Sequence, residues 1–99
     1  MTRGNAPSRT DANHKEITEA LTAVHWPYLD VHASANLCDI ITVDVFGQPL
    51  FIEFKDPKER NHLTDGEREF MEMVNRVREY YVISCDVEET FAAIGLMGR

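Results

Sequence analysis

Basic residues are scarce in this sequence. It has 10 Lys and Arg against 17 Asp and Glu, a formal net charge of −7 over 99 residues. Proteins that coat nucleic acid through bulk electrostatics need an excess of cations, because they bind by neutralising phosphates. The composition excludes that class of binder but leaves room for a local basic patch. It also leaves room for carboxylates that hold a divalent cation, which would reduce their repulsion from phosphate.

Cysteines and long apolar runs are also scarce. Cys38 and Cys85 are the 2 cysteines, and because they lack CxxC spacing we expect buried free thiols without a disulfide. No apolar run has the length needed to cross a bilayer, and residues 1–15 lack the hydrophobic segment of a secretory signal. We therefore expect a cytoplasmic protein that has no membrane partner.

The length and the 43% hydrophobic content predict one globular domain with a single core. Residues 1–10 have little apolar content and contain Gly4, Pro7 and Ser8, so we expect a flexible N-terminal arm. The single domain would then span residues 11–99.

Short β-prone runs alternate with helical patterns along that domain. Strands are predicted over 28–34, 38–46, 50–55 and 80–84. Because the second and third runs flank a turn at Gly47, they predict an antiparallel hairpin. The predicted order is helix, three strands, helix, strand, helix.

The helix boundaries follow from capping residues. Thr10 or Asp11 would cap a first helix, and Thr64 with Glu67 forms a capping box that begins a second. A final helix would end at Gly95. The apolar stripes expected to face the core are Ile17, Leu21 and Val24 on the first helix, and Phe70, Met73, Val74 and Val77 on the second.

A charged pair, Glu53 and Lys55, interrupts an otherwise apolar strand. Strand alternation puts this pair on one face with Phe51, while Leu50, Ile52 and Phe54 form the core face. The hairpin would bring Asp39 close to Glu53. Two nearby carboxylates repel each other unless a cation lies between them, and Mg²⁺ prefers such oxygen ligands. The alternative is a plain surface ion pair, which contributes about 0–1 kcal/mol.

Taken together, these residues resemble the PD-(D/E)XK nuclease superfamily, and within it the small phage-type VRR-NUC domains. The resemblance runs from about Asp11 to Ile94 and includes "DANHKEI", "LCDII", "FIEFKDP", "LTDGE" and "YYVISCDVEE". It implies an α/β fold with a restriction-endonuclease-like αβββαβ core, in which helices flank a small mixed sheet.

The resemblance also implies an active site. Asp39 and Glu53 would hold Mg²⁺ or Mn²⁺, the main-chain carbonyl of Phe54 would be a further metal ligand, and Lys55 would be the catalytic lysine. The family usually has proline before this aspartate, where the present sequence has Cys38.

A glutamate on the first helix commonly completes the family's site, and Glu16 is our candidate for that catalytic and metal-binding role. Helix spacing puts Glu16 on one face with Asn13. The alternative is that Glu16 only solvates the helix. Asn13, His14 and Glu67 are accessory candidates, although the capping box alone would explain Glu67.

Four basic or titratable residues follow the charged strand. Lys58, Arg60, His62 and Arg68 form the basic cluster nearest the expected site. They would either contact DNA phosphates or belong to a solvated loop.

The resulting hypothesis is a Mg²⁺- or Mn²⁺-dependent endodeoxyribonuclease that hydrolyses phosphodiester bonds. The resemblance implies branched DNA of the Holliday-junction type as substrate, a homodimer as the active form, and a phage or prophage origin. One alternative is a catalytically weak DNA-binding module of the same fold. Another is an acidic domain that binds a protein partner.

Overall fold

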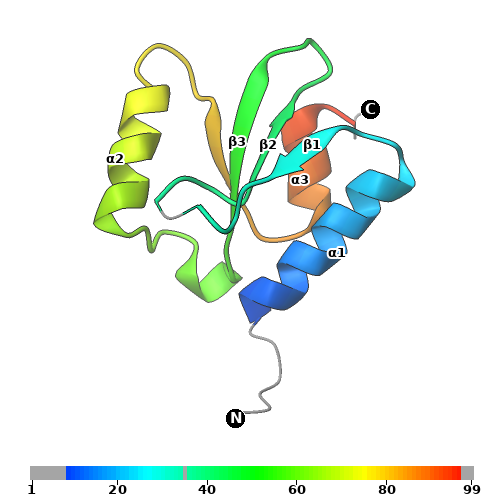
Figure 1. The fold of residues 1–99 in the computed structure, drawn as a ribbon, viewed down its shortest axis with the longest axis horizontal. Helices are drawn as coiled ribbons and strands as arrows, with labels where there is room; N and C mark the ends of the chain where they lie inside the picture. Colours follow the sequence, from blue (N-terminus) through cyan, green and yellow to red (C-terminus); the bar gives the residue numbers. More distant parts are fainter. Residues whose placement is uncertain (1–8, 35, 97–99) are drawn as a thin grey trace.

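The computed structural model describes residues 9–34 and 36–96. A four-stranded mixed sheet lies between helices on its two faces, which confirms the expected α/β class (Figure 1). Among the described residues, no helix combines the length and apolar content needed to cross a membrane. The elements are α1 (Arg9–Ala23), β1 (Tyr28–Asp30), β2 (Ile40–Val43), β3 (Pro49–Phe54), the 3₁₀ turn η1 (Pro57–Glu59), α2 (Asp65–Val74), β4 (Tyr81–Ser84) and α3 (Val87–Ile94).

The strands follow one another across the sheet in chain order, β1-β2-β3-β4. The first two pairings are antiparallel, and Ile40 pairs with Ile52 across the predicted hairpin. β4 runs parallel to β3, with Phe51 opposite Tyr81, so the chain must cross over between them. α2 lies on that crossover. β3 is therefore the strand through which both halves of the sheet are joined.

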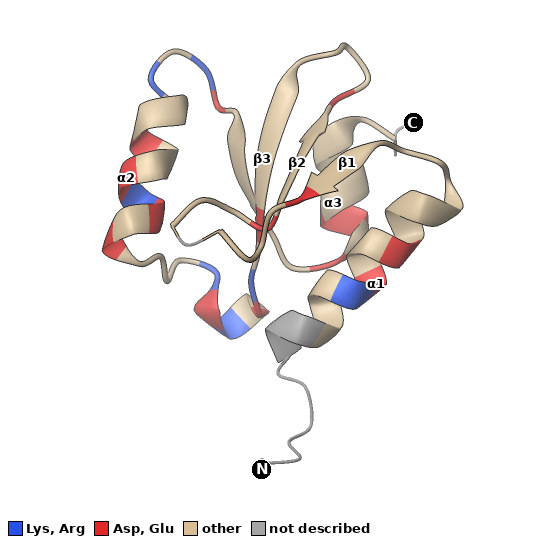
Figure 2. Ribbon diagram, viewed as in Figure 1, with Lys and Arg blue, Asp and Glu red and all other residues tan. Residues whose placement is uncertain are grey.

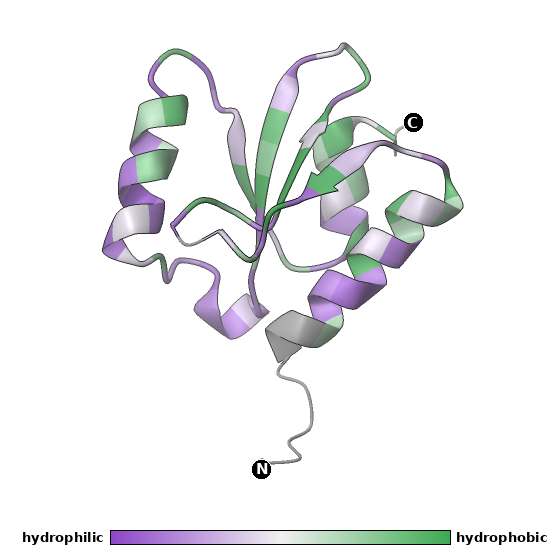
Figure 3. Ribbon diagram, in the orientation of Figure 1, coloured by the Kyte–Doolittle hydropathy of each residue, from purple (hydrophilic) through white to green (hydrophobic). Residues whose placement is uncertain are grey.

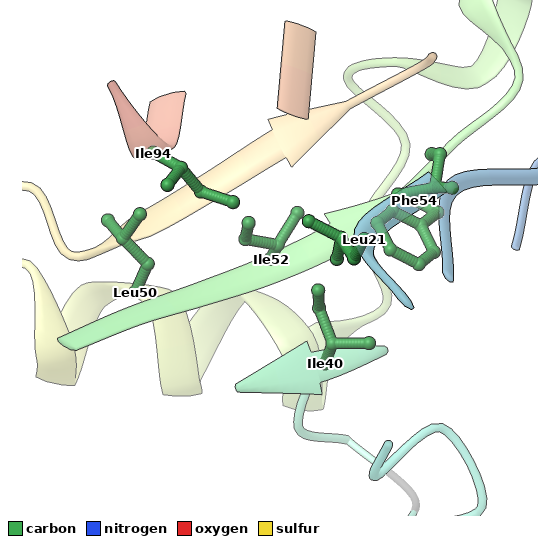
Figure 4. Packing of buried hydrophobic residues seen from close by; sticks show 7 residues of the cluster. Leu21, Ile40, Leu50, Ile52, Phe54 and Ile94 are labelled. Atoms are coloured by element: carbon green, nitrogen blue, oxygen red, sulfur yellow. The ribbon is translucent and has the colours of Figure 1, made fainter. Parts of the chain in front are cut away.

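One face of β3 forms the main core. Leu50, Ile52 and Phe54 point into it, as strand alternation predicted, and are 6%, 0% and 0% exposed. Figure 4 shows these side chains meeting residues from both covering helices. Ile17 and Leu21 come from α1, Ile40 from β2 and Ile94 from α3.

The opposite face of β3 lies under α2. Phe70 of α2 packs edge-to-face against Phe51, with ring centroids 5.3 Å apart, and against Tyr81 of β4 at 5.9 Å. Glu53 and Lys55 belong to this second face. Figure 3 shows that β3 is hydrophobic along its middle and hydrophilic where it leaves the sheet, which is where the charged pair lies.

The first two strands are shorter than predicted because aspartates turn the chain. β1 ends at Asp30, whose carboxylate accepts the His32 backbone N–H at 3.2 Å, so the prediction of a strand to residue 34 is wrong. β2 ends at Val43, not at Phe46. The Asp44 carboxylate accepts the N–H groups of Phe46 and Gln48 there, at 2.8 and 2.9 Å.

The first helix begins earlier than predicted. Arg9, Thr10 and Asp11 all lie within α1, so neither Thr10 nor Asp11 caps it from outside. Residues 1–8 of the expected arm lie outside the described residues. α1 therefore begins two residues before the predicted start of the domain, and the division into arm and domain stays a prediction.

Three apolar residues assigned to the core are exposed instead. Val24 follows the end of α1 and is 48% exposed, because the chain turns at His25 with a φ of 60°. Met73 and Val77 are 61% and 87% exposed. α2 stops at Val74, since the Asn75 side chain accepts the N–H groups of residues 80 and 81 and turns the chain into β4.

Candidate active site

Asp39 is held against the end of β3 by hydrogen bonds from main chain and side chain. Its N–H donates to the Ile52 carbonyl at 3.0 Å, and its Oδ2 accepts the Phe54 N–H at 2.7 Å. The carboxylate thus continues the β2–β3 pairing beyond the last residue of β2. Because the N–H and C=O of a strand residue point to the same side, the strand geometry directs the Phe54 carbonyl toward Asp39.

Glu53 and Lys55 form a largely buried pair beside this aspartate. Glu53 is 7% exposed, and its Oε2 lies 3.4 Å from the Lys55 Nζ. Glu67 Oε1, from the first turn of α2, lies 3.5 Å from the same Nζ. The alternative of a plain surface ion pair is therefore wrong. Figure 2 shows the acidic and basic positions adjoining at the end of β3.

The pKa values indicate an excess of negative charge at this end of the sheet. Burial raises the pKa of Glu53, and the carboxylates of Asp39 and Glu67 raise it further, to about 8, against the opposing effect of Lys55. Burial also raises the pKa of Asp39, although its hydrogen bond from Phe54 acts in the opposite direction. A cation between Asp39 and Glu53 would relieve the cost of ionising both.

The residues present fit a divalent cation. Two buried or half-buried carboxylates and a strand carbonyl supply oxygen ligands, the donor type that Mg²⁺ and Mn²⁺ prefer. Asp39, Glu53 and the Phe54 carbonyl are thus suited to the metal-binding roles expected of them. Lys55 stands beside them as the nearest ammonium group.

The first helix presents Asn13 and His14 to the site. The Asn13 Nδ2 donates to the Lys55 carbonyl at 3.4 Å. His14 Nδ1 lies 3.7 Å from Asp39 Oδ1, and its ring packs edge-to-face on Phe54, with centroids 5.3 Å apart. Of these two accessory candidates, His14 lies near the Asp39 carboxylate and Asn13 contacts the main chain of Lys55.

Glu16 points elsewhere. The buried side chains of Ile17 and Leu21 set the inward face of α1, and Glu16 lies off that face with an exposed side chain. In the described part of the chain, no contact joins Glu16 to Asp39 or Glu53. The structure supports the alternative that it solvates the helix, because sequence spacing alone did not show which side of the helix faces the sheet.

Glu67 serves two partners. Its Oε1 accepts the Thr64 N–H at 3.0 Å, and its own N–H donates to Thr64 Oγ1 at 3.1 Å, so the predicted capping box is confirmed. The same carboxylate faces Lys55. The cap therefore holds a third acidic group at the site.

Two of the four residues predicted to contact DNA pair with carboxylates. Arg60 pairs with Glu89 of α3 at 2.5 Å, and His62 pairs with Glu59 at 2.8 Å. Within the described residues, Lys58 on η1 and Arg68 on α2 have no carboxylate partner and are exposed. Lys58 and Arg68 are therefore better placed than the other two to contact phosphate.

Asp30 and His32 were missed by the sequence reasoning. The Asp30 carboxylate contacts His14 Nε2 at 2.8 Å and His32 Nδ1 at 2.5 Å. Burial raises the pKa of Asp30, but hydrogen bonds from His32 and His14 outweigh it and lower the pKa to about 2. The available signal was the D-x-H spacing after the first strand, whose meaning depends on where that strand ends.

Cys38 immediately precedes the site residue Asp39. Its thiol is 4% exposed and lies 3.2 Å from the Ile40 carbonyl. Burial, with the nearby charges of Glu53 and Asp39, raises its pKa to about 12, so it is an unreactive thiol. Cys85 is also buried and free, as expected.

Comparisons of the chain with protein-family models, with curated proteins and with solved structures gave no match.

Proposed function

We propose that this protein is a metal-dependent DNA endonuclease with a restriction-endonuclease-like fold. The observation that carries the proposal is the convergence of Asp39, Glu53 and Lys55 at one end of the sheet, with Glu53 7% exposed. Burying acidic groups beside each other lowers the stability of a fold, so their presence here indicates a functional role. The order α1-β1-β2-β3-α2-β4 agrees with the αβββαβ core that the motifs imply.

Asp39, Glu53 and the Phe54 carbonyl would hold Mg²⁺ or Mn²⁺. When bound, such a cation supplies Lewis-acid stabilisation of a phosphoryl oxygen and lowers the pKa of water. The hydrogen bond from the Phe54 N–H fixes one oxygen of Asp39, which leaves its other oxygen for a ligand or for His14. The raised pKa of Glu53 would fall as the cation replaces its proton.

Lys55 would orient the attacking water and stabilise the charge that develops on the phosphoryl group. The hydrolysis forms one P–O bond to the water oxygen and breaks one P–O bond to a sugar oxygen. The water loses a proton to solvent, and the departing sugar oxygen gains one. Glu53 and Glu67 hold the Lys55 ammonium in place from two sides.

Asn13 and His14, both on α1, would position Lys55 and the metal ligand Asp39. Asn13 bonds the Lys55 carbonyl, and His14 faces Asp39. Lys58 and Arg68 would then contact the DNA backbone, where they would offset part of the acidic charge.

The substrate class is proposed from the motifs. Branched DNA, such as a four-way junction, has two-fold symmetry that a homodimer with two active sites would match. Sedimentation of the protein with and without a four-way junction measures its oligomeric state directly. A dimer on the junction is expected, and a monomer at every concentration would contradict this part of the proposal.

The test of activity is cleavage of a panel of DNA molecules. Linear duplex, nicked duplex, flap and four-way-junction DNA are incubated with the protein in Mg²⁺, in Mn²⁺ or in EDTA. The matched variants are Glu53→Gln, at the site, and Glu69→Gln, which removes the same charge from the exposed side of α2.

Metal-dependent cleavage by wild type and Glu69→Gln, but not by Glu53→Gln, is the expected result. Equal cleavage by all three proteins would assign the activity to a contaminant and refute the proposal. Gel shifts without cleavage in either metal would instead favour a DNA-binding module. No shift and no cleavage would favour an acidic protein-interaction domain.

A further inference from the structure

A second group of side chains, distinct in ligand chemistry, lies beside the candidate active site. His14 belongs to α1, Asp30 ends β1, and His32 lies in the turn that follows. One ligand atom from each lies within 4.8 Å of the other two. We propose that this His14–Asp30–His32 cluster binds a divalent transition-metal ion of the Zn²⁺ class.

Both imidazoles direct a nitrogen at the same carboxylate. His14 Nε2 lies 2.8 Å from Asp30 Oδ2, and His32 Nδ1 lies 2.5 Å from Oδ1. The ring centroids of the two histidines are 4.6 Å apart. The ligand atoms of a tetrahedral zinc site are about 3.3–3.5 Å apart, given metal–ligand bonds of about 2.0–2.2 Å. Small side-chain movements would therefore open the cluster around an ion.

The donor set selects the kind of ion. Two imidazole nitrogens and one carboxylate suit Zn²⁺, Co²⁺ or Ni²⁺, whereas Mg²⁺ prefers a site made of oxygens. The Asp39–Glu53 site offers only oxygens. The two neighbouring sites would therefore take different metals, so the cluster does not depend on the proposed nuclease activity.

Charge and exposure at the cluster favour ion entry. The Asp30 carboxylate contacts a ring nitrogen of each histidine. Within the described residues its ion-pair partners are the two histidines. The Asp30 and His32 side chains are 40% and 58% exposed, so an ion can reach them from solvent.

The other ring nitrogen of His14 lies near a second carboxylate, beyond hydrogen-bond distance but within reach of a small movement. Its Nδ1 lies 3.7 Å from Asp39 Oδ1, and the Phe54 N–H holds the second oxygen of Asp39. Histidines that bind metals usually donate their other ring N–H to such a carboxylate, which fixes the tautomer and the ring orientation. Asp39 would thus orient His14 for the ion. Three protein ligands leave a fourth position for water or another oxygen.

The test is a titration of Co²⁺ followed by visible absorption, with Zn²⁺ and Mg²⁺ as competitors. Untagged protein is stripped with EDTA, dialysed and titrated at pH 7.5. The main variant is His32→Ala, because this exposed side chain can be removed without disturbing the core, as circular dichroism would verify. His62→Ala is the matched control, since it removes another exposed imidazole that contacts a carboxylate. Glu53→Gln controls for binding at the oxygen site.

We expect the cluster to bind one Co²⁺, with similar affinity, in wild type, His62→Ala and Glu53→Gln, and any Co²⁺ held at the oxygen site is identified by its loss in Glu53→Gln. Zn²⁺ should displace the Co²⁺, and Mg²⁺ should not. The affinity of His32→Ala should fall by more than about 100-fold, because it loses a direct ligand. Wild-type affinity in His32→Ala, loss of the whole signal in Glu53→Gln, or no binding by wild type at millimolar Co²⁺ would each overturn the proposal.

Discussion

At the scale of single residues, the most unusual group is Glu53, which is buried beside two other carboxylates and one ammonium. Asp39, Glu67 and Lys55 are the charged groups that face it, and burial with the two acids raises its pKa to about 8. In the absence of metal, the folded protein therefore keeps a proton on Glu53 over a pH range in which the unfolded chain has released it.

The proton retained on Glu53 predicts that the unfolding free energy depends on pH. The contribution of Glu53 is fully present below its unfolded pKa of 4.5 and is lost as pH rises through about 8. Wild type should thus lose about 2–4 kcal/mol of unfolding free energy between pH 5 and 9 relative to Glu53→Gln, which cannot titrate. Urea unfolding in EDTA measures the difference.

Glu69→Gln provides the control, because the unfolding free energy of this variant should depend on pH as that of wild type does. Excess Mg²⁺ should flatten the wild-type curve, because the cation favours the ionised carboxylate. Parallel curves for wild type and Glu53→Gln across the range would contradict the raised pKa.

Sequence patterns were sufficient to bring Asp39, Glu53 and Lys55 together, because strand alternation and one hairpin turn determine their faces and their register. They were not sufficient for the first helix. There, only the packed structure shows that Asn13 and His14 face the sheet while Glu16 does not. Asp30 was hidden for a related reason, since its role depends on a turn that its own side chain makes.

At the scale of elements, the capping box of α2 connects local stability to the site. Thr64 Oγ1 accepts the Glu67 N–H, while the Glu67 carboxylate bonds the Thr64 N–H and faces Lys55. Replacing Thr64 by Ala should lower the unfolding free energy by about 1 kcal/mol, because it removes an N-cap acceptor. Chemical denaturation at pH 7 would measure the loss.

Thr64→Ser keeps the hydroxyl and should behave like wild type within about 0.5 kcal/mol. An alanine variant as stable as the serine variant would show that the box contributes little.

Which element boundaries could be predicted depended on whether their signals are local in the sequence. Two caps that depend on local sequence, the box at Thr64 and the helix end at Gly95, were found from the sequence. The ends of β1 and β2 depend on turns made by aspartates. The apolar pattern continues beyond each turn, so the sequence predicted strands that were too long.

At the scale of the whole molecule, the net charge of −7 opposes DNA binding. Without a divalent cation, the ionised carboxylates at the site would repel the phosphates of the proposed DNA substrate. In EDTA at pH 9, Glu53→Gln should therefore bind duplex DNA about three- to tenfold more tightly than wild type. Fluorescence anisotropy at low, fixed salt gives both affinities.

Glu69→Gln changes the net charge by the same amount away from the site. It should tighten binding much less than Glu53→Gln does. Equal affinities for the two variants would show that only the total charge matters, and that DNA does not approach the end of β3.

The class and order of the fold could be predicted because each helix and strand carries its own periodicity. The arrangement of basic residues could not. Arg60 and His62 are near the site in the sequence, yet Glu89 and Glu59 pair with them once the chain folds. The Arg60–Glu89 pair joins distant elements and depends on the whole fold, whereas the His62–Glu59 pair is local, between residues three positions apart.

We propose above all that the group of Asp39, Lys55 and the buried Glu53 cuts DNA. The most direct test of this claim is single-turnover cleavage in saturating Mg²⁺ by wild type and Lys55→Ala, with Lys15→Ala, exposed on α1, as control. Lys55→Ala should be slower by about 100-fold or more, because it loses transition-state stabilisation, and should still bind DNA. Cleavage by Lys55→Ala at the wild-type rate would contradict the claim.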